Sequence, residues 1–129
     1  TRIVESEIVG NREGASFVRS SVTVTNTTIA DNQDLGGVRI SDGSVSISNC
    51  VISGNSTSGY HTAAGVTVEG EETVLMIEGN RFESNTGSRC GGLYSPIYRI
   101  RKLDGSMLLD PSTLNVFINN EPCDFYIED

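Results

Sequence analysis

Hydrophobic and polar residues alternate in short runs that recur along the chain in one arrangement. The clearest copy is residues 45–55, in which Val45 and Ile47 alternate with serine, Ile52 follows a polar corner, and Asn55 stands three residues after Ile52. Alternation of β-branched and polar residues predicts a strand with one buried face. The unit therefore predicts a strand, a corner, a shorter second strand and a polar end.

The same unit recurs before and after residues 45–55, with an asparagine at its end each time. These are Asn11, Asn32, Asn55 and Asn85, spaced 21, 23 and 30 residues apart. A repeat of this length predicts a solenoid, because a single coil cannot bury its own apolar edge. We expect the asparagines to form a stacked column that satisfies backbone groups at a corner. The alternative is that asparagine serves there only as a favourable turn residue.

Each repeat also contains a strand introduced by glycine, at residues 14–17, 37–40, 65–68 and 92–95. Alternation within the strands predicts which residues face outward. The expected outward rows are Arg2, Thr23, Ser46 and Met76; Val4, Thr25, Ser48 and Glu78; and Ser16, Arg39, Thr67 and Tyr94.

Beyond Pro96 the repeat is altered. Residues 104–109 resemble residues 42–47, which predicts the first strand of a last coil, with Leu114 in the place of Ile52 and Phe117 in the place of the asparagine. We expect residues 125–127 to form its Gly-led strand without the glycine. Residues 97–103 are expected to form an added strand or loop. An atypical end coil is typical of solenoids, because it must protect an open sheet edge.

With its units aligned, the chain resembles the right-handed parallel β-helix superfamily of pectate-lyase-like proteins. It is most similar in pattern to the repeats of chlamydial polymorphic outer-membrane proteins, which pair a Phe-x-x-Asn motif with a Gly-Gly-Ala-aliphatic motif. Residues 82–85 match the first motif, and residues 36–39, 64–67 and 91–94 match the second in relaxed form. The resemblance implies a fold shared by enzymes, adhesins and inert spacers, so it does not specify a function.

The expected fold is therefore an all-β, right-handed parallel β-helix of about four to five coils. We expect one domain over residues 1–129, with regular coils over 1–95 and an altered, capping coil over 96–129. Because the first residues lie within a repeat, we expect the chain to be a fragment of a longer protein.

Charge narrows the choice of partners. The 129 residues include nine basic and seventeen acidic side chains, for a formal charge of −8. This charge repels phosphate backbones and anionic membranes, so we expect no nucleic-acid partner and no direct membrane insertion. The sequence contains no apolar run long enough for a transmembrane helix. Sequons begin at Asn26 and Asn55, and their glycosylation stays open because such triplets are frequent in chains rich in Asn, Ser and Thr.

The three cysteines are expected to differ. No Cys-x-x-Cys spacing is present, which argues against a zinc site. Three cysteines can form at most one disulfide. Cys50 lies between two corners, and we expect it to be buried and unreactive. Cys90 and Cys123 both precede a Gly-led strand, and we expect them to lie one coil apart, close enough to pair.

Candidate chemistry is sparse. Arg99-Ile-Arg-Lys102 resembles a motif of polygalacturonase-like enzymes, but their adjacent aspartates and Gly-His-Gly are missing. No expected outward row places two acids in adjacent coils, whereas acid–base chemistry on a sugar needs two positioned groups. We therefore expect no catalytic residue, no cofactor and no metal.

We expect any small ligand to lie across Arg39, Thr67 and Tyr94. Tyr60 and His61, in the long loop at residues 56–64, are expected to form a wall of the site. The leading hypothesis is a non-catalytic scaffold, adhesive or assembly module of a secreted, cell-envelope or organelle-lumen protein, with protein partners or assembly subunits. The alternative is a carbohydrate-active or glycan-binding fragment that uses the same residues.

Overall fold

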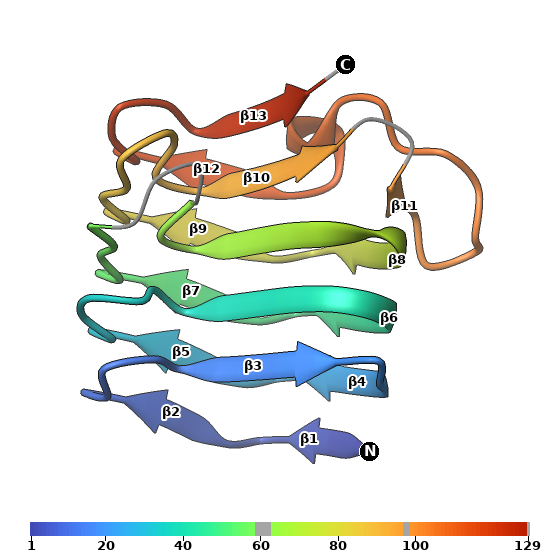
Figure 1. Cartoon of the computed structure of the whole chain (residues 1–129), viewed down its shortest axis with the longest axis horizontal. Coiled ribbons are helices and arrows are strands. Elements are labelled where there is room, and N and C mark those ends of the chain that lie inside the picture. The colour runs from blue at the N-terminus through green and yellow to red at the C-terminus, as the bar shows by residue number, and fades with distance from the viewer. Residues whose placement is uncertain (59–62, 97–98, 129) are drawn as a thin grey trace.

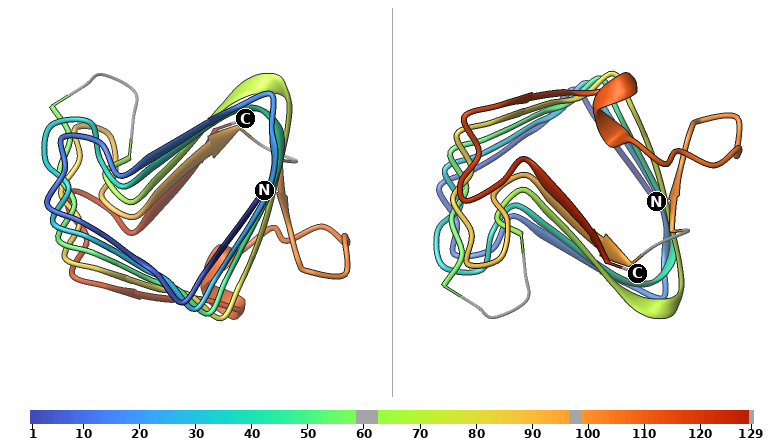
Figure 2. Two further views of the ribbon diagram at one scale, coloured as in Figure 1. Left: turned by 90° about the horizontal axis from the view of Figure 1, so that it is seen from below. Right: turned by 90° about the horizontal axis from the view of Figure 1, so that it is seen from above.

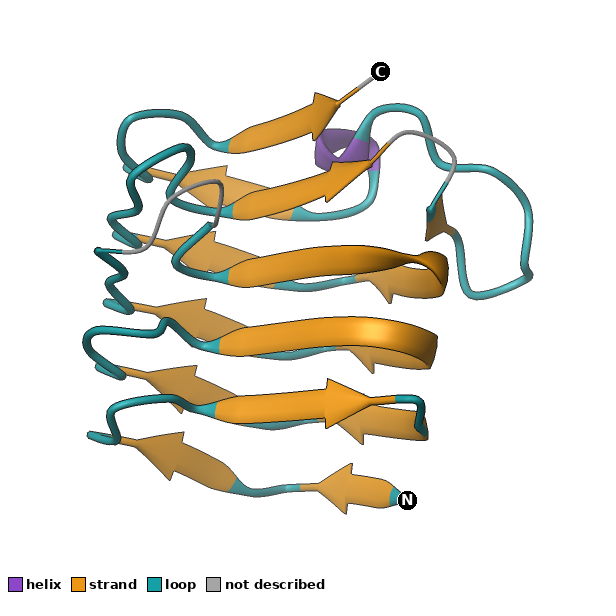
Figure 3. Ribbon diagram, viewed as in Figure 1, coloured by secondary structure: helices purple, strands orange, loops and turns teal. Residues whose placement is uncertain are grey.

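The strands of the computed structural model, which describes residues 1–58, 63–96 and 99–128, form two sheets. The larger sheet has eight strands and the smaller has five. Every ladder that joins two of the named strands is parallel. Figures 1 and 3 show the strands stacked in successive layers. The predicted all-β class is therefore confirmed, with parallel sheets.

The strands of each sheet come from alternating parts of the chain. The larger sheet contains β1 (Arg2–Val4), β3 (Ala15–Val18), β4 (Ser21–Thr25), β6 (Val38–Ser48), β8 (Val66–Glu78), β10 (Leu93–Pro96), β11 (Ile100–Arg101) and β13 (Phe125–Glu128). The smaller sheet contains β2 (Glu7–Val9), β5 (Thr28–Ala30), β7 (Val51–Ser53), β9 (Arg81–Glu83) and β12 (Val116–Ile118). The 3-10 helix η1 (Pro111–Thr113) precedes β12.

The chain runs alternately through the two sheets, and each repeat of this path, which we call a passage, pairs with the one before. A passage contains a first strand, a short strand of the smaller sheet and a Gly-led strand. In β6 and β8 the Gly-led strand of one passage continues into the first strand of the next, which explains their length of 11 and 13 residues. Figure 2 shows the passages nearly superposed when viewed end-on. The predicted alignment of Arg2, Thr23, Ser46 and Met76 is confirmed by their pairing.

The inward apolar side chains form a continuous core between the sheets. Ile29, Ile52 and Phe82 lie above one another in the smaller sheet and are at most 1% exposed. The ring of Phe117 stacks on Phe82 with the centroids 4.6 Å apart. Complete burial of such side chains contributes roughly 1.5–3 kcal/mol each. Core burial thus depends on the stacking of passages.

The predicted asparagine column is present and is longer than expected. The backbone N–H and the side-chain amide of Asn32 both donate to Oδ1 of Asn55, at 3.1 and 3.0 Å. Asn55 donates in the same way to Asn85, at 3.1 and 2.9 Å, and Asn85 to Asn120, at 3.1 and 2.9 Å. Exposed Asn11 donates its backbone N–H to Asn32 at 3.0 Å. The amides therefore act as a ladder and not only as turn residues.

A second ladder, which the sequence analysis did not predict, lies at the corner after the first strand. Asn80 donates its backbone N–H and its side-chain amide to Oδ1 of Asn115, at 3.1 and 3.0 Å. Cys50 donates its backbone N–H to Asn80 at 3.0 Å, and Ser6 donates to Oγ1 of Thr27 at 3.4 Å. Each passage is thus held at two corners by polar side chains as well as by its sheets.

Columns of residues with left-handed backbone form the corners. A positive φ lets the chain change direction sharply between strands, and Gly, Asn and Asp adopt it most readily. These residues are Glu5, Asn26, Asn49 and Gly79 after the first strand; Gly10, Asp31, Gly54, Ser84 and Asn119 after the short strand; and Arg19, Asp42 and Gly70 after the Gly-led strand.

The first strand of the last passage differs from the prediction. Ile100 and Arg101 pair with Leu75 and Met76, so β11 holds the place predicted for residues 104–109. Met107 pairs back with Arg101 in an antiparallel bridge, and the peptide N–H of Lys102 donates to the Ser106 carbonyl at 2.8 Å. The resemblance to residues 42–47 was misleading because Asp-Gly-Ser forms a hairpin turn here. Of the predicted added segment 97–103, residues 97–98 lie outside the described residues.

The rest of the last passage is shifted by three residues relative to the prediction. Phe117 pairs with Phe82, which places it in the apolar position predicted for Leu114. Asn120 holds the ladder position predicted for Phe117. The Gly-led position of residues 125–127 is confirmed, because Phe125 pairs with Leu93 in a parallel ladder.

Replacing Asn55 with alanine should lower the free energy of unfolding by on the order of 1–3 kcal/mol, because buried backbone groups lose their partners. Asn49 is exposed and has φ 52°, so alanine there carries a backbone cost of its own. The matched control is therefore Asn49→Gly, which should change stability by less than about 0.5 kcal/mol. Urea unfolding measures both, and equal midpoints would contradict the structural role of the ladder.

Candidate functional site

The predicted ligand-binding row lies on the outer face of the Gly-led strands. Arg39 pairs with Thr67, and Thr67 pairs with Tyr94, so the predicted alignment is confirmed. The row begins at Ser16 and continues to Tyr126, which the prediction did not include. Tyr60 and His61, the predicted wall of the site, lie outside the described residues.

The centre of this row does not face solvent, which corrects the prediction for Thr67. The Thr67 side chain is 3% exposed because Ala63 lies against it. The Ala63 peptide N–H donates to Thr67 Oγ1 at 2.9 Å, and the Thr67 hydroxyl donates to the Ala63 carbonyl at 2.9 Å. The hydroxyl is therefore engaged within the chain instead of being presented to a ligand.

Tyr94 is also mostly covered, at 8% exposure, which corrects the prediction that its ring faces solvent. Its hydroxyl donates to the Glu128 carboxylate, and its ring stacks with Tyr126 at a centroid distance of 6.0 Å. Burial, together with the hydrogen bond to Glu128, raises the pKa of Tyr94 to about 12. The phenol is therefore neutral at physiological pH.

Arg89 covers both rings of this pair. Its guanidinium carbon lies 5.8 Å from the Tyr94 centroid and 4.6 Å from the Tyr126 centroid, within the range of cation–π attraction. It donates to the Tyr126 hydroxyl at 3.2 Å and pairs with Glu128 at 3.8 Å. The hydrogen bond to Tyr126 raises the pKa of Arg89. Arg89, Tyr94, Tyr126 and Glu128, which we call the tyrosine cluster, therefore satisfy one another.

Arg39 is the member of the predicted site that remains exposed. It forms an ion pair with Glu69 at 3.1 Å, and both side chains are partly solvated. Exposed pairs of this kind contribute at most about 1 kcal/mol, so Arg39 can exchange Glu69 for an external anion at little cost. The accessible parts of the row are thus Ser16 and Arg39 at one end and Tyr126, which is 38% exposed, at the other.

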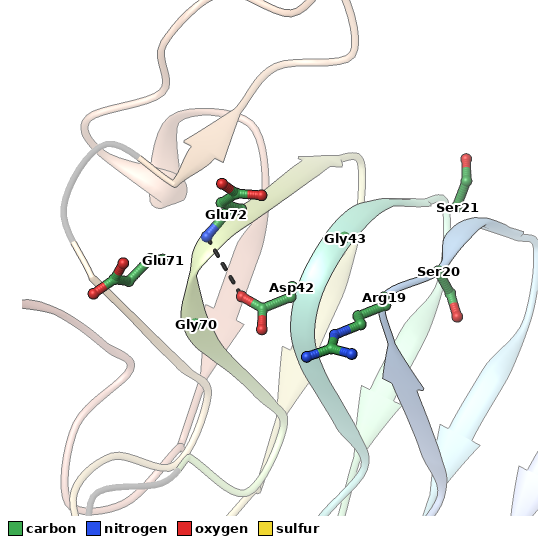
Figure 4. A pocket seen from close by; sticks show the side chains of 8 residues that line it. All are labelled: Arg19, Ser20, Ser21, Asp42, Gly43, Gly70, Glu71 and Glu72. Carbon is green, nitrogen blue, oxygen red and sulfur yellow. Dashed lines mark hydrogen bonds between the residues drawn. The ribbon is translucent and has the colours of Figure 1, made fainter.

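A depression lies at the corner after the Gly-led strands (Figure 4). It has a volume of about 770 Å³ and is lined by Arg19, Ser20, Ser21, Asp42, Gly43, Gly70, Glu71 and Glu72. The Glu72 peptide N–H donates to Asp42 at 3.5 Å. Glu71 and Glu72 lie at the bend within β8. Its lining holds three acids, Asp42, Glu71 and Glu72, and one cation, Arg19, so its rim is mainly acidic.

The cysteines behave as predicted. A disulfide joins Cys90 and Cys123, whose Cα atoms lie 4.9 Å apart in successive passages. Cys50 is free and 2% exposed, and burial raises the pKa of its thiol. A buried thiol with a raised pKa holds little of the reactive thiolate at neutral pH.

Comparisons with known proteins do not identify the chain. No family model, curated protein or solved structure matches it. Across residues 1–58, 63–96 and 99–128, no group of three or more His, Cys, Asp or Glu side chains is arranged to hold a metal ion. The same described ranges contain no helix with the length and hydropathy needed to span a membrane.

Sequence reasoning missed three of the four members of the tyrosine cluster. Tyr126 could have been found, because residues 125–127 were aligned with the Gly-led strands and Tyr126 then follows Tyr94 in the outward row. Glu128 follows two residues later in the same strand and faces the same way. Arg89 lies in a loop, and no periodic signal places a loop residue.

Stability should fall as pH rises from about 10 to about 12, because the folded state keeps the Tyr94 proton that the unfolded state loses. Below the unfolded pKa the contribution is fully present. Urea unfolding at stepped pH should show a smaller fall in the free energy of unfolding for Tyr94→Phe than for the unaltered chain.

Glu128→Gln should lower the pKa of Tyr94, because the charged acceptor of its hydrogen bond is lost. Ultraviolet titration of the tyrosines measures this change. An unchanged titration would contradict the role of Glu128.

Alkylation under denaturing conditions without reductant should modify one thiol, that of Cys50, because the disulfide protects the other two. Mass spectrometry counts the adducts. After reduction the count should rise to three, which serves as the internal control. Three adducts without reductant would show that the bridge is absent.

Proposed function

We propose that this chain is a right-handed parallel β-helix that serves as a rigid, non-catalytic scaffold. Each passage would be one coil. Parallel pairing of successive passages and their superposition in the end-on view support the helical winding (Figure 2). The right hand follows from the general preference of parallel strand connections within a sheet. We further propose membership of the pectate-lyase-like superfamily, supported by Phe-x-x-Asn at residues 82–85 and again in register at residues 117–120.

The observation that carries the scaffold role is the engagement of the outer row with its own chain. Thr67 bonds to Ala63, and Tyr94 bonds to Glu128. A tyrosine with a pKa of about 12 is poorly suited to proton transfer near neutral pH. These contacts support a surface that is rigid and preformed instead of one that holds free acid–base groups.

A secreted, cell-envelope or organelle-lumen location fits this proposal. The Cys90–Cys123 disulfide persists in such oxidising compartments and is rare in the cytosol. In these places a rigid solenoid serves as an adhesive surface or as a subunit of an assembly, bound to protein partners.

A glycan-binding or carbohydrate-active fragment is the second candidate. The exposed ring of Tyr126 beside Arg89 favours it, because aromatic faces stack on apolar faces of ligands while cations bind acidic groups. A ligand would then contact Tyr126 and Arg39 instead of the buried Thr67.

A screen for lyase and hydrolase activity on acidic polysaccharides, combined with a glycan array, separates the two candidates. The scaffold role predicts no turnover and no saturable binding. Turnover that is lost in His61→Ala would overturn it. Glycan binding that is lost in Tyr126→Ala and kept in Val18→Ala, a change at another exposed apolar residue of the same sheet, would establish the second candidate instead.

A further inference from the structure

An apolar hairpin projects from the body of the molecule at the last passage. Residues 101–107, coloured orange in Figures 1 and 2, stand clear of the stacked strands. Leu103 and Met107 on this hairpin are each 42% exposed, and Leu109 at its base is 69% exposed. Exposed apolar side chains that gather on one projecting element mark an interaction site more often than scattered ones do.

The hairpin is held in one conformation by its own contacts. The Ser106 peptide N–H and hydroxyl donate to the Asp104 carboxylate at 2.9 and 2.6 Å. Leu108 is 5% exposed and belongs to the main core, and its peptide N–H donates to the Ile100 carbonyl at 3.2 Å. Because the hairpin is ordered before binding, little conformational entropy is lost when a partner covers it.

The charge of the hairpin is opposite to that of the chain. Arg99, Arg101 and Lys102 place three of the nine basic residues within four positions, while the whole chain carries a formal charge of −8. The Asp104 carboxylate lies in the turn at the tip, where it accepts hydrogen bonds from Ser106. The hairpin therefore offers two exposed apolar side chains, Leu103 and Met107, beside a basic base, and the basic base complements a hollow with an acidic rim.

Such a hollow lies on the same side of the molecule. The depression described above has Asp42, Glu71 and Glu72 on its rim, which outnumber its one cation, Arg19. Ile100 pairs with Leu75, three residues after Glu72 in β8, so the hairpin base and the acidic rim are separated by roughly 10 Å along the strand. Neighbouring basic and acidic patches on one surface can satisfy each other in two copies related by a two-fold axis.

We propose that a second copy of this chain covers this face, with the hairpin of each copy seated on the acidic corner of the other. Leu103 and Met107 would cover this depression, and Lys102 would pair with Glu72. The acids beside the hairpin disfavour an anionic lipid surface as the occupant. This inference names a partner for the assembly role proposed above and rests on that role. The experiment for the dimer measures molecular mass, whereas the experiment for the scaffold role measures turnover and glycan binding. The two proposals can therefore fail independently.

Sedimentation velocity over a concentration series tests the proposal with two charge reversals. The unaltered chain should show a monomer–dimer equilibrium, and Lys102→Glu or Glu72→Lys alone should weaken the dimer at least about tenfold. Mixing the two variants should restore it, because both contacts of the mixed dimer then join opposite charges. Arg12→Glu is the control, since Arg12 pairs with Asp34 away from this face and gives the same monomer charge as Lys102→Glu.

Leu103→Ser should weaken the dimer without lowering the melting temperature, because the side chain is already exposed. An unaltered chain that stays monomeric at every concentration would overturn the proposal, as would a dimer insensitive to both reversals. Sedimentation of the monomer with phosphatidylserine vesicles, lost in Leu103→Ser, would assign the hairpin to lipid and overturn it equally.

Discussion

The structure depends on satisfying the backbone at its corners. Parallel sheets pair the N–H and C=O groups of the strands, but between strands the chain turns away from those partners. At one corner the amides of Asn32, Asn55, Asn85 and Asn120 take over this role. All four donate to a backbone carbonyl of the previous passage, and the first three also donate to the asparagine of the next passage. An amide reaches its neighbour only if the passages stack at a fixed spacing. The number of residues per repeat therefore varies in the segment after the ladder asparagine, as in residues 56–64. It does not vary between the short strand and the ladder asparagine.

The left-handed corner residues constrain their neighbours along the stack as well as themselves. Asp31, Asp42 and Asn49 direct a side-chain oxygen toward the place where the equivalent residue of the next passage would carry its Cβ atom. That residue is glycine in each case: Gly54, Gly70 and Gly79. At these three corners the glycine provides both the positive φ and the space that the oxygen below it needs, whereas Asn26 is followed by Asn49. This coupling between passages would be invisible in any single repeat.

The regular passages were predictable from sequence because their signals are local and repeated. Ile52 and Asn55 mark a short strand and a ladder whatever surrounds them. The prediction for the last passage was wrong because its local signal was misleading. Asp104-Gly105-Ser106 resembles the corner at residues 42–44 but forms a hairpin turn. Phe117-x-x-Asn120 has the correct register, but alignment on that resemblance places Phe117 in the asparagine position instead. The burial of Thr67 could not be predicted, because it depends on the path of a long loop, which no period specifies.

The tyrosine cluster and the hairpin, which are the candidate binding surfaces, lie at the end of the stack that a disulfide stabilises. Inward residues at the first passage, such as Ile8, are only partly buried, because no passage covers them. At the other end the Asn120 amide bonds to Asp124, and the disulfide closes a sequence separation of 33 residues. In the chain-entropy model such a closure contributes roughly 3–4 kcal/mol. Local opening is therefore suppressed at the passages that carry the tyrosine cluster and the hairpin, and both are presented in a preformed geometry.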